Sequence, residues 1–291
     1  MTLLHNSQHT VWRLRGVSFR YGRGPDILKH VDLELTGGKV YGILGPNGSG
    51  KTTLLYLLCG LNSPTAGEVE FLGTGIDRYT KREIAKRVAM VPQDFQMRFA
   101  FTVRQAVEMG RHPHTPRFSS LSPEEIQLVR DVMQELDILA LSHRPVTMLS
   151  GGEKQRVAAA RALVQAGDAL LLDEATSNLD IFHSLSILNV VKKRAVDHNL
   201  TVVAAVHDIN LATPFCDQFI FLHKGKVAAL GPPARVLTHD LLQKIYGVEA
   251  RVWYDEFTSA PTVSFRMGGC PETGDMMGAD TIGPQGEDTH A

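Results

Sequence analysis

The sequence predicts an α/β fold with a largely parallel central sheet, and three patterns along the chain lead to that prediction. Apolar runs at 40–44, 169–173 and 201–206 are too continuous to alternate, which is typical of strands covered on both faces. A glycine-rich segment at 45–53 joins the first run to an apolar helical pattern. The section from about 95 to 147 is helical in pattern and lacks short strands, which indicates an inserted helical subdomain.

Length and composition are those of an ordinary globular chain. Its 291 residues suffice for one large α/β domain with a subdomain, or for two small domains. The hydrophobic fraction is 43% and the charged fraction 21%, and no run of about 18 apolar residues could span a bilayer. The first ten residues lack the pattern of a secretory signal, so we expect neither export nor a membrane-spanning segment.

Cysteine and charge give further limits. Cys59, Cys216 and Cys270 are an odd number without Cys-x-x-Cys spacing, which argues against a disulfide framework or a zinc site and favours a reducing, cytoplasmic setting. The net charge of −1 gives no reason to expect a nucleic-acid partner. Residues 267–291 carry −5, so the remainder carries +4 by subtraction. This acidic, glycine-rich end predicts a disordered tail.

Strands are also predicted at both ends of the main domain. The run 11–19 and the period-two segment 31–35 are typical of strands in the opening third. Near the other end, runs at 219–222 and 226–230 flank the turn signal Lys224-Gly225, which predicts a hairpin.

One helix start is clear within the helical section. Ser122 is a candidate N-cap, Pro123 lies in the first turn, and Glu125 completes a capping box. Apolar residues then recur on one face, so we expect this helix to be structural.

The loop from Gly45 to Thr52 matches G-x-x-x-x-G-K-[ST], whose glycines let backbone N–H groups close around phosphate oxygens at a helix N-terminus. Lys51 would bridge the β- and γ-phosphates, and Thr52 would bind Mg²⁺. A glycine turn that matches by chance is the alternative, disfavoured by the apolar strand and helix on either side. The candidate nucleotide-binding residues here are Gly45, Pro46, Asn47, Gly48, Ser49, Gly50, Lys51, Thr52 and Thr53.

A pair of carboxylates follows the apolar run at 170–174. Asp173 is placed to hold Mg²⁺, and Glu174 beside it to polarise a water molecule. An acid pair at the surface after a core strand is a common alternative for this motif taken alone.

The segment 149–153 reads Leu-Ser-Gly-Gly-Glu and has two interpretations. Ser150 and Glu153 form a capping box, so the segment could simply start a helix. A capping box does not call for two glycines, however, whereas a helix N-terminus that receives a γ-phosphate does, because bulky side chains would keep the anion away.

In this order the motifs resemble those of the ABC ATPase family across roughly 10–245. The loop 45–53 resembles the Walker A motif, Gln93 the Q-loop, 149–153 the signature, 170–174 the Walker B strand, 177–180 the D-loop, His207 the H-loop and Tyr21 the aromatic that stacks on adenine. Asn178 departs from the small apolar residue more usual in the D-loop, but Asp180 is present. Without the resemblance, His207 would be a structural histidine, and periodicity alone would select neither Gln93 nor Tyr21.

The resemblance implies a P-loop NTPase of the ABC ATPase fold, with an antiparallel β subdomain and an inserted helical subdomain. The expected divisions are an N-terminal extension at 1–10, the ATPase domain at 11–245 with the helical insertion at about 95–165, a strand-like extension at 246–266 and the acidic tail at 267–291.

It also implies ATP and Mg²⁺ as ligands and a homodimer in which the signature of one subunit faces the Walker A loop of the other. The catalytic residues would be Glu174, His207, Gln93 and Lys51. Nucleotide would also contact Tyr21, Ser150, Gly151, Gly152 and Asp180, and Mg²⁺ would contact Thr52, Gln93 and Asp173. Ser150 and Gly152 would act on the nucleotide of the partner.

The transported compound is suggested by subfamily resemblance alone. Segments 101–103, 109–114, 206–212 and 246–248 are similar to those in ATPases of iron-siderophore, haem and cobalamin importers. We expect uptake of a ferric chelate, with haem or cobalamin as alternatives. The partners implied are membrane permease subunits and, indirectly, a substrate-binding protein, at the cytoplasmic face of the membrane.

Other functional classes fit less well. A soluble ABC ATPase acting on nucleic acid would carry a coiled-coil or zinc insertion or a second cassette, and no heptad array or cysteine cluster is present. A scaffold without activity is disfavoured because Lys51, Glu174 and His207 are all retained. His112 and His114 could suggest a metal site, but two histidines without further ligands are weak support.

Overall fold

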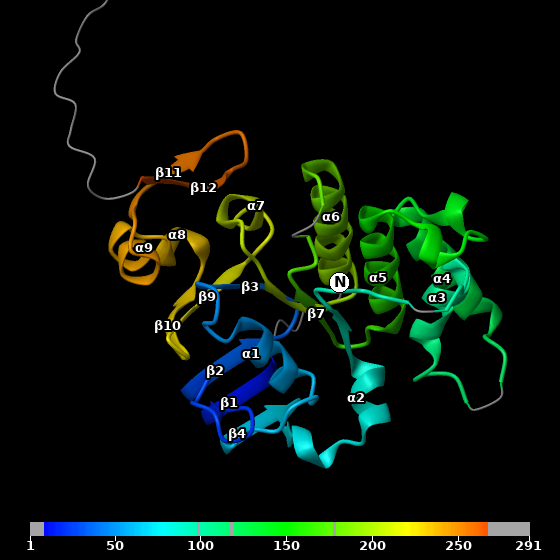
Figure 1. The fold of residues 1–291 in the computed structure, drawn as a ribbon, viewed down its shortest axis with the longest axis horizontal. Helices are drawn as coiled ribbons and strands as arrows, with labels where there is room; N and C mark the ends of the chain where they lie inside the picture. The colour runs from blue at the N-terminus through cyan, green and yellow to red at the C-terminus, as the bar shows by residue number, and fades with distance from the viewer. Residues whose placement is uncertain (1–8, 98, 117–118, 177–178, 267–291) are drawn as a thin grey trace, which may run out of the picture.

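A six-stranded sheet organises the computed structural model, which describes residues 9–97, 99–116, 119–176 and 179–266 (Figure 1). Its strand order is β10-β9-β3-β8-β7-β6. The strands are β3 (Val40–Leu44), β6 (Val88–Val91), β7 (Ala169–Asp173), β8 (Thr201–Ala205), β9 (Gln218–His223) and β10 (Lys226–Gly231). Neighbours from β9 to β6 pair in parallel, and β10 pairs with β9 as an antiparallel hairpin. The predicted parallel sheet and hairpin are therefore confirmed.

Both faces of this sheet are buried, which explains the continuous apolar runs. In β7, Leu170 and Leu172 belong to one core cluster, whereas Ala169 and Leu171 belong to a second cluster on the opposite face. Every residue of β3, β7 and β8 is buried. Since period two along a strand sends neighbouring side chains to opposite faces, a strand with two covered faces must be apolar throughout.

A second, antiparallel sheet covers one side of the core beside α1 (Lys51–Leu58). Its order is β2-β1-β4-β5, with β1 (Thr10–Phe19), β2 (Leu28–Thr36), β4 (Ala66–Phe71) and β5 (Thr74–Gly75). The buried Trp12 indole Nε1 donates to the Leu58 carbonyl at 3.0 Å, and its ring packs against Phe71 at 5.3 Å between centroids. These contacts fix the sheet against the end of α1.

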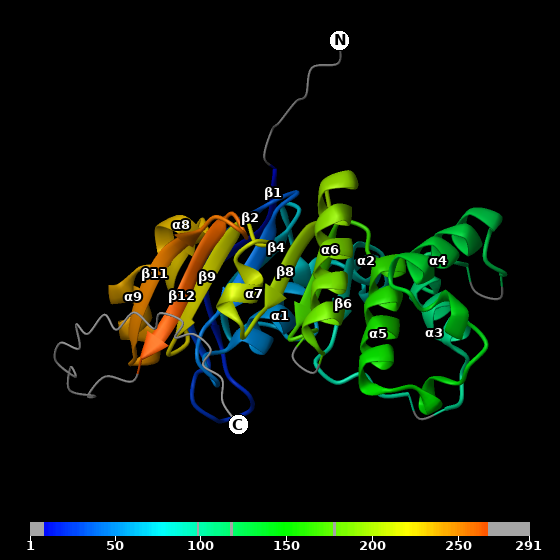
Figure 2. The same cartoon turned by 90° about the horizontal axis from the view of Figure 1, so that it is seen from above.

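The helical part of the chain lies at one end of the molecule (Figure 2). It contains α3 (Val103–Glu108), α4 (Pro123–Glu135) and α5 (Gly151–Gln165), while α2 (Lys81–Arg87) precedes β6. Ser122 caps α4 in a capping box with Glu125, as predicted. The apolar sides of α3, α4 and α5 join the core cluster that also covers one face of the central sheet.

The last third returns to the central sheet and ends in a hairpin. It contains α6 (Ile181–Asp197), α7 (Ile209–Ala212), α8 (Pro233–Val236) and α9 (His239–Tyr246), then β11 (Glu249–Asp255) and β12 (Ala260–Arg266). The hairpin contacts α9 through β11, and α7 and α8 through β12 (Figure 2). The predicted acidic tail at 267–291 lies outside the described residues. Within the described ranges, no helix has both the length and the apolar character needed to cross a bilayer.

Candidate active site

The glycine loop joins the end of β3 to the start of α1, and two of its backbone positions require glycine. Gly45 has φ 153°, and a Cβ there would stand 2.2 Å from the Leu222 carbonyl oxygen. Gly50, the N-cap of α1, has φ 104°, and a Cβ there would stand 2.7 Å from a methyl group of Leu28. Because L side chains rarely adopt such φ values, both positions select glycine.

Lys51 is the first residue of α1 and is buried beneath this loop. Lys51 is only 6% exposed. Its Nζ donates to the carbonyl oxygens of Gly45 at 2.9 Å and Pro46 at 3.4 Å. Burial lowers the pKa of Lys51, and the nearby Glu174 and Asp173 carboxylates oppose that shift. A buried cation beside free helix N–H groups suits a polyanion such as a nucleotide phosphate.

Ser49 provides a further test of that fit. Its hydroxyl Oγ is buried and has no hydrogen-bond partner among the described parts of the chain. Buried hydroxyls are usually paired, since an unpaired one costs free energy. An acceptor such as a phosphate oxygen in the loop would satisfy it.

Thr52 and Asp173 join the loop to the end of β7. Thr52 Oγ1 donates to Asp173 Oδ1 at 2.9 Å, and Asp173 is 1% exposed. Burial raises the pKa of Asp173, the bond from Thr52 lowers it, and the Glu174 charge raises it. One hydroxyl and one carboxylate oxygen, next to phosphates, form the kind of partial ligand set that Mg²⁺ uses in phosphate sites. Among the described residues, no group of three or more His, Cys, Asp or Glu side chains could hold a metal without such help.

Three polar side chains follow three neighbouring parallel strands and meet at one edge of the sheet. Gln93 follows β6, Glu174 follows β7 and His207 follows β8. Gln93 Nε2 donates to Glu174 Oε2 at 2.8 Å, and His207 Nε2 lies 2.5 Å from Glu174 Oε1. The structure therefore brings together Gln93, Glu174 and His207, which sequence reasoning had selected separately.

The backbone at Glu174 is held in an unusual conformation. Its φ is 51°, and its N–H donates to the Ala205 carbonyl oxygen of β8 at 3.2 Å. A non-glycine residue in this region is strained, and such residues persist where surrounding contacts fix them. Beside Glu174 and His207 a cavity of about 330 Å³ is lined on its apolar side by Leu179 and Leu211.

The start of α5 combines the two features that the sequence suggested. Ser150 is the N-cap: its Oγ accepts from the Glu153 N–H at 3.3 Å, and its own N–H donates to Glu153 Oε2 at 2.7 Å. A Cβ on Gly151 would meet nothing within 4 Å, and one on Gly152 would lie 3.3 Å from a methyl group of Leu179. The capping box is thus confirmed, but packing within this chain gives no reason for a glycine at 151.

Two candidate groups, the start of α5 and Asp180, make no hydrogen bond to the cluster around Lys51 and Glu174 among the described residues. Both views show α5 on the far side of α6 from α1, the helix that begins at the glycine loop (Figures 1 and 2). Asp180 caps α6, accepting from the His183 N–H at 2.9 Å, and its side chain is 63% exposed. Ser177 and Asn178 of the same predicted loop lie outside the described residues.

Tyr21 lies on the surface beyond the end of β1. It is 51% exposed and stands edge-on to Phe19, with ring centroids 4.8 Å apart. Asn62 Nδ2 donates to its hydroxyl at 3.4 Å. An exposed ring of this kind is free to stack on a planar ligand.

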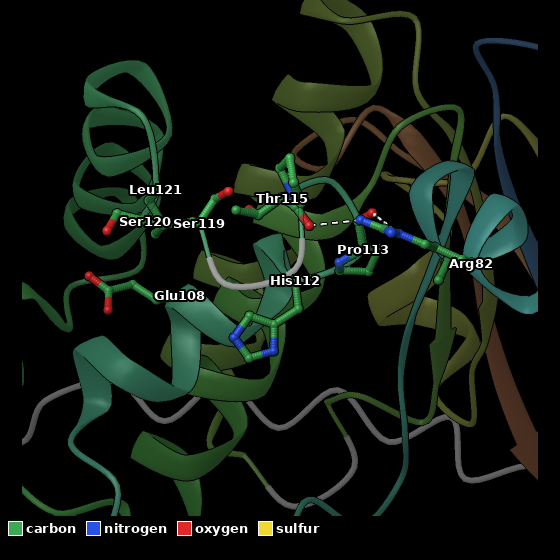
Figure 3. Close-up of a pocket in the computed structure, with 10 residues that line it drawn as sticks. Arg82, Glu108, His112, Pro113, Thr115, Ser119, Ser120 and Leu121 are labelled. Atoms are coloured by element: carbon green, nitrogen blue, oxygen red, sulfur yellow. Dashed lines mark hydrogen bonds between the residues drawn. The ribbon is translucent and has the colours of Figure 1, made fainter.

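A separate cavity of about 660 Å³ lies between α2 and the segment after α3 (Figure 3). Arg82 of α2 crosses to that segment, donating from Nε to the Pro113 carbonyl oxygen at 3.0 Å and from Nη2 to that of Thr115 at 2.7 Å. His112 lines the cavity, whereas His114 bonds the Gln165 carbonyl oxygen at 2.8 Å, and burial lowers the pKa of His114. The two histidines therefore have different surroundings.

The sequence alone indicates no role for Arg82, Asn210 or Tyr246. In the structure Arg82 lines the cavity of Figure 3, and Asn210 lies three residues after His207. The one available signal for Arg82 was the Thr80 and Glu83 capping box that starts α2. Asn210 and Tyr246 contact residues distant in sequence, and periodicity cannot reveal such contacts.

The chain is similar to a known protein family and to named members of it. Residues 28–177 match the family model described as "ABC transporter". The cobalamin import ATP-binding protein BtuD of Halobacterium salinarum (strain ATCC 29341 / DSM 671 / R1) is 42% identical over 241 residues, covering 83% of this chain and 60% of that protein. The chain thus spans 60% of the length of that relative.

Two other relatives are matched over nearly their whole length. The hemin import ATP-binding protein HmuV of Vibrio parahaemolyticus serotype O3:K6 is 37% identical, covering 88% of this chain and 96% of that protein. The ferric enterobactin transport ATP-binding protein FepC of Escherichia coli (strain K12) is 34% identical, covering 87% of this chain and 94% of that protein.

Solved structures share the fold. An inward-facing ABC transporter inferred to be of the metal-chelate type aligns with a TM-score of 0.75 and 27% identity, covering 89% of this chain and 97% of that one. The ATP-binding cassette MJ0796, a dimer in a post-hydrolysis state bound to ADP and Pi, aligns with a TM-score of 0.66 and 30% identity, covering 76% and 98%. The chain therefore belongs to the ABC transporter family and has the fold of its ATP-binding cassettes.

Proposed function

We propose that this chain is the ATP-hydrolysing subunit of an importer that takes up a ferric siderophore or a related metal chelate. One observation carries the enzymatic part of the proposal. Glu174 is held between Gln93 and His207, beside the buried Lys51 and the Thr52 and Asp173 pair. A carboxylate fixed next to a cationic phosphate loop is the arrangement that hydrolysis of a phosphoanhydride requires.

Each residue of the site has its own role in hydrolysis. Lys51 and the N–H groups of the glycine loop hold the β- and γ-phosphates, and Ser49 donates to a phosphate oxygen. Thr52 and Asp173, with Gln93, hold Mg²⁺, which when bound neutralises charge on the phosphates. Glu174 orients a water molecule and accepts its proton, while His207 keeps Glu174 in place and contacts the γ-phosphate. The exposed ring of Tyr21 stacks on the adenine.

The site is completed by a second copy of the chain. Ser150, Gly151, Gly152 and Asp180 lie apart from the glycine loop, yet Gly151 leaves open space at the N-terminus of a 15-residue helix. A helix N-terminus without a side chain can approach an anion closely. The dimeric relative bound to ADP and Pi supports this arrangement.

The relatives support the proposed partners and transported compound. The named relatives serve import of hemin, ferric enterobactin and cobalamin, and a structural neighbour is inferred to be of the metal-chelate type. We infer that the chain binds a membrane permease at the cytoplasmic face, with the cavity bounded by Arg82 and His112 as the docking groove, and that a substrate-binding protein delivers the cargo. Import of haem or cobalamin is the alternative.

Co-purification tests the transporter assignment. The tagged chain is recovered from detergent-solubilised membranes, and the proteins that accompany it are identified by mass spectrometry. A permease with many membrane spans is the expected partner. Recovery of the chain from the soluble fraction with nucleic acid or ribosomes would contradict the proposal and favour a soluble ABC ATPase.

Uptake assays then separate the candidate cargoes. Cells that depend on this chain are given radiolabelled ferric siderophore, haem or cobalamin, with Glu174→Gln as the matched inactive form. We expect the variant to lose uptake of the ferric chelate. Loss confined to haem or cobalamin would replace the ferric-chelate assignment with that alternative.

A further inference from the structure

The last strand of the fold is hydrogen-bonded to the short helix that follows His207. Asn210 Nδ2 donates to the Val263 carbonyl oxygen at 3.0 Å, and the Val263 N–H donates to Asn210 Oδ1 at 2.8 Å. One side-chain amide thus satisfies both backbone groups of a single residue in β12, in the manner of a strand neighbour. The pairing needs a donor and an acceptor on the same planar group, and asparagine supplies both.

The helix that carries Asn210 has little stability of its own. α7 is a single turn of four residues, Ile209–Ala212, capped by Asp208, whose side chain accepts from the Leu211 N–H at 2.9 Å. A turn this short is not stable in isolation, so tertiary contacts determine where it lies. Two such contacts are present: burial of Ile209 and Ala212, and the pair of hydrogen bonds between the Asn210 side chain and the Val263 backbone.

The β11–β12 hairpin is held in place by contacts that do not involve α7. β11 and β12 are paired along their whole length, from Glu249 opposite Arg266 to Asp255 opposite Ala260. The His239 ring bonds the Ala250 carbonyl oxygen at 2.8 Å, and Val263 is 3% exposed. The hairpin is therefore fixed to α9 independently of α7.

The helix that packs against this hairpin, α9, lies near the glycine loop. Tyr246, at the end of α9, stacks edge-on against Phe265 of β12 at 6.3 Å between ring centroids. Burial raises the pKa of Tyr246 to about 12, and an interaction with the backbone of Gly45 opposes that rise. The C-terminal part of the chain thus contacts the segment after His207 directly, through β12, and lies near the start of the glycine loop through α9.

We propose that Asn210 is a positioning residue for ATP hydrolysis, acting through Val263 to hold α7 so that His207 stays against Glu174. This inference rests on the proposed ATPase function. His207 lies three residues before Asn210, and His207 Nε2 lies 2.5 Å from Glu174 Oε1. Small displacements of a group that orients a catalytic carboxylate reduce turnover more strongly than nucleotide binding, which Lys51 and the glycine loop provide directly.

Steady-state ATP hydrolysis by the full chain tests the inference. We expect Asn210→Ala to lower kcat about tenfold with the KM for ATP changed less than about twofold. Asn210→Asp keeps an acceptor for the Val263 N–H but loses the donor to its carbonyl oxygen, so its loss of kcat should be smaller. Asn189→Ala removes an exposed amide from α6 and is the matched control, expected to behave as the wild type.

Hydrogen–deuterium exchange without nucleotide gives a readout independent of activity. Faster exchange is expected for residues 207–212 in Asn210→Ala and not in Asn189→Ala. Should Asn210→Ala fail to unfold cooperatively, Asn210→Asp takes its place in both measurements.

Wild-type kcat in Asn210→Ala, a rise in KM without loss of kcat, or unchanged exchange at 207–212 would each overturn the inference. A wild-type chain that fails to hydrolyse ATP, with α7 still loosened in Asn210→Ala, would instead remove the proposed function, and the catalytic role of Asn210 with it.

Discussion

Glu174 carries more structural constraint than any other residue of the site. Its two carboxylate oxygens contact Gln93 and His207, and its backbone has a positive φ fixed by the Ala205 carbonyl. Strain of this kind persists where it positions a reacting group. The side chain is therefore aimed by its backbone and by two neighbours from adjacent strands.

Glu174→Gln keeps the size of the side chain and its ability to contact His207, but removes the carboxylate that accepts a proton. We expect kcat for ATP hydrolysis to fall by at least about 100-fold while ATP binding is retained. ATP should then trap the dimer, seen as a larger species in size-exclusion chromatography. The matched control is Glu68→Gln, on the exposed part of β4. Near-normal turnover in Glu174→Gln would remove Glu174 from the role of base.

Asp173 gives a prediction on stability. Burial raises the pKa of Asp173, so the folded protein binds a proton more readily than the unfolded chain. The ionised form is therefore destabilising in the folded state, and that effect appears as pH rises through the interval between the unfolded and the folded pKa. We expect Asp173→Asn to raise the thermal unfolding midpoint of the nucleotide-free chain by a few degrees at pH 7.

The gain in Asp173→Asn should shrink as pH is lowered below the unfolded pKa, where the wild-type carboxyl is also neutral. Differential scanning calorimetry at pH 7 and near pH 3 measures both values. Asp26→Asn, at an exposed position, is the control and should change neither midpoint. An equal gain for Asp173→Asn at both pH values would show that desolvation of the carboxylate is not the cause.

At the scale of elements, α4 and α5 begin with the same kind of cap, but we expect only the cap of α5 to take part in ATP hydrolysis. α4 and α5 start with capping boxes built on Ser122 and Ser150, each with a glutamate three residues later. Removing an N-cap serine costs about 1 kcal/mol. We expect Ser122→Ala and Ser150→Ala to lose similar stability in urea unfolding, and only Ser150→Ala to lower kcat. Equal kcat in the two variants would leave Ser150 as a helix cap and nothing more.

The elements that could be predicted from sequence are those whose surroundings impose a pattern. β3, β7 and β8 were predicted because both of their faces are buried, and α4 because its cap is local. The pairing of Gln93, Glu174 and His207 follows from their places after adjacent strands, but only once the strand order is known. Arg82 and Asn210 could not be predicted, since their partners at Pro113 and Val263 are far away in sequence.

At the scale of the whole molecule, the proposed function divides one site between two copies of the chain. The glycine loop, Asp173 and Glu174 would form one half, and the start of α5 would form the other. Gly151 has open space around it, and its place in the first turn of a helix would accept an acidic side chain readily. Under the proposed function, a nucleotide held by the partner subunit would approach Gly151 closely, which would account for the missing side chain.

The most direct test of this account mixes two inactive variants. Lys51→Ala removes the cation of the glycine loop, and Gly151→Asp places a negative charge where the γ-phosphate of the partner would lie without disturbing packing in its own chain. A dimer of one with the other contains one site with both defects and one site with neither.

The measurement is ATP hydrolysis by each variant alone and by their equimolar mixture. The account predicts almost no turnover by either variant alone and recovery in the mixture to about a quarter of the wild-type rate, since half of the dimers would hold one intact site of two. A mixture as inactive as its components, or full activity in Gly151→Asp alone, would contradict it.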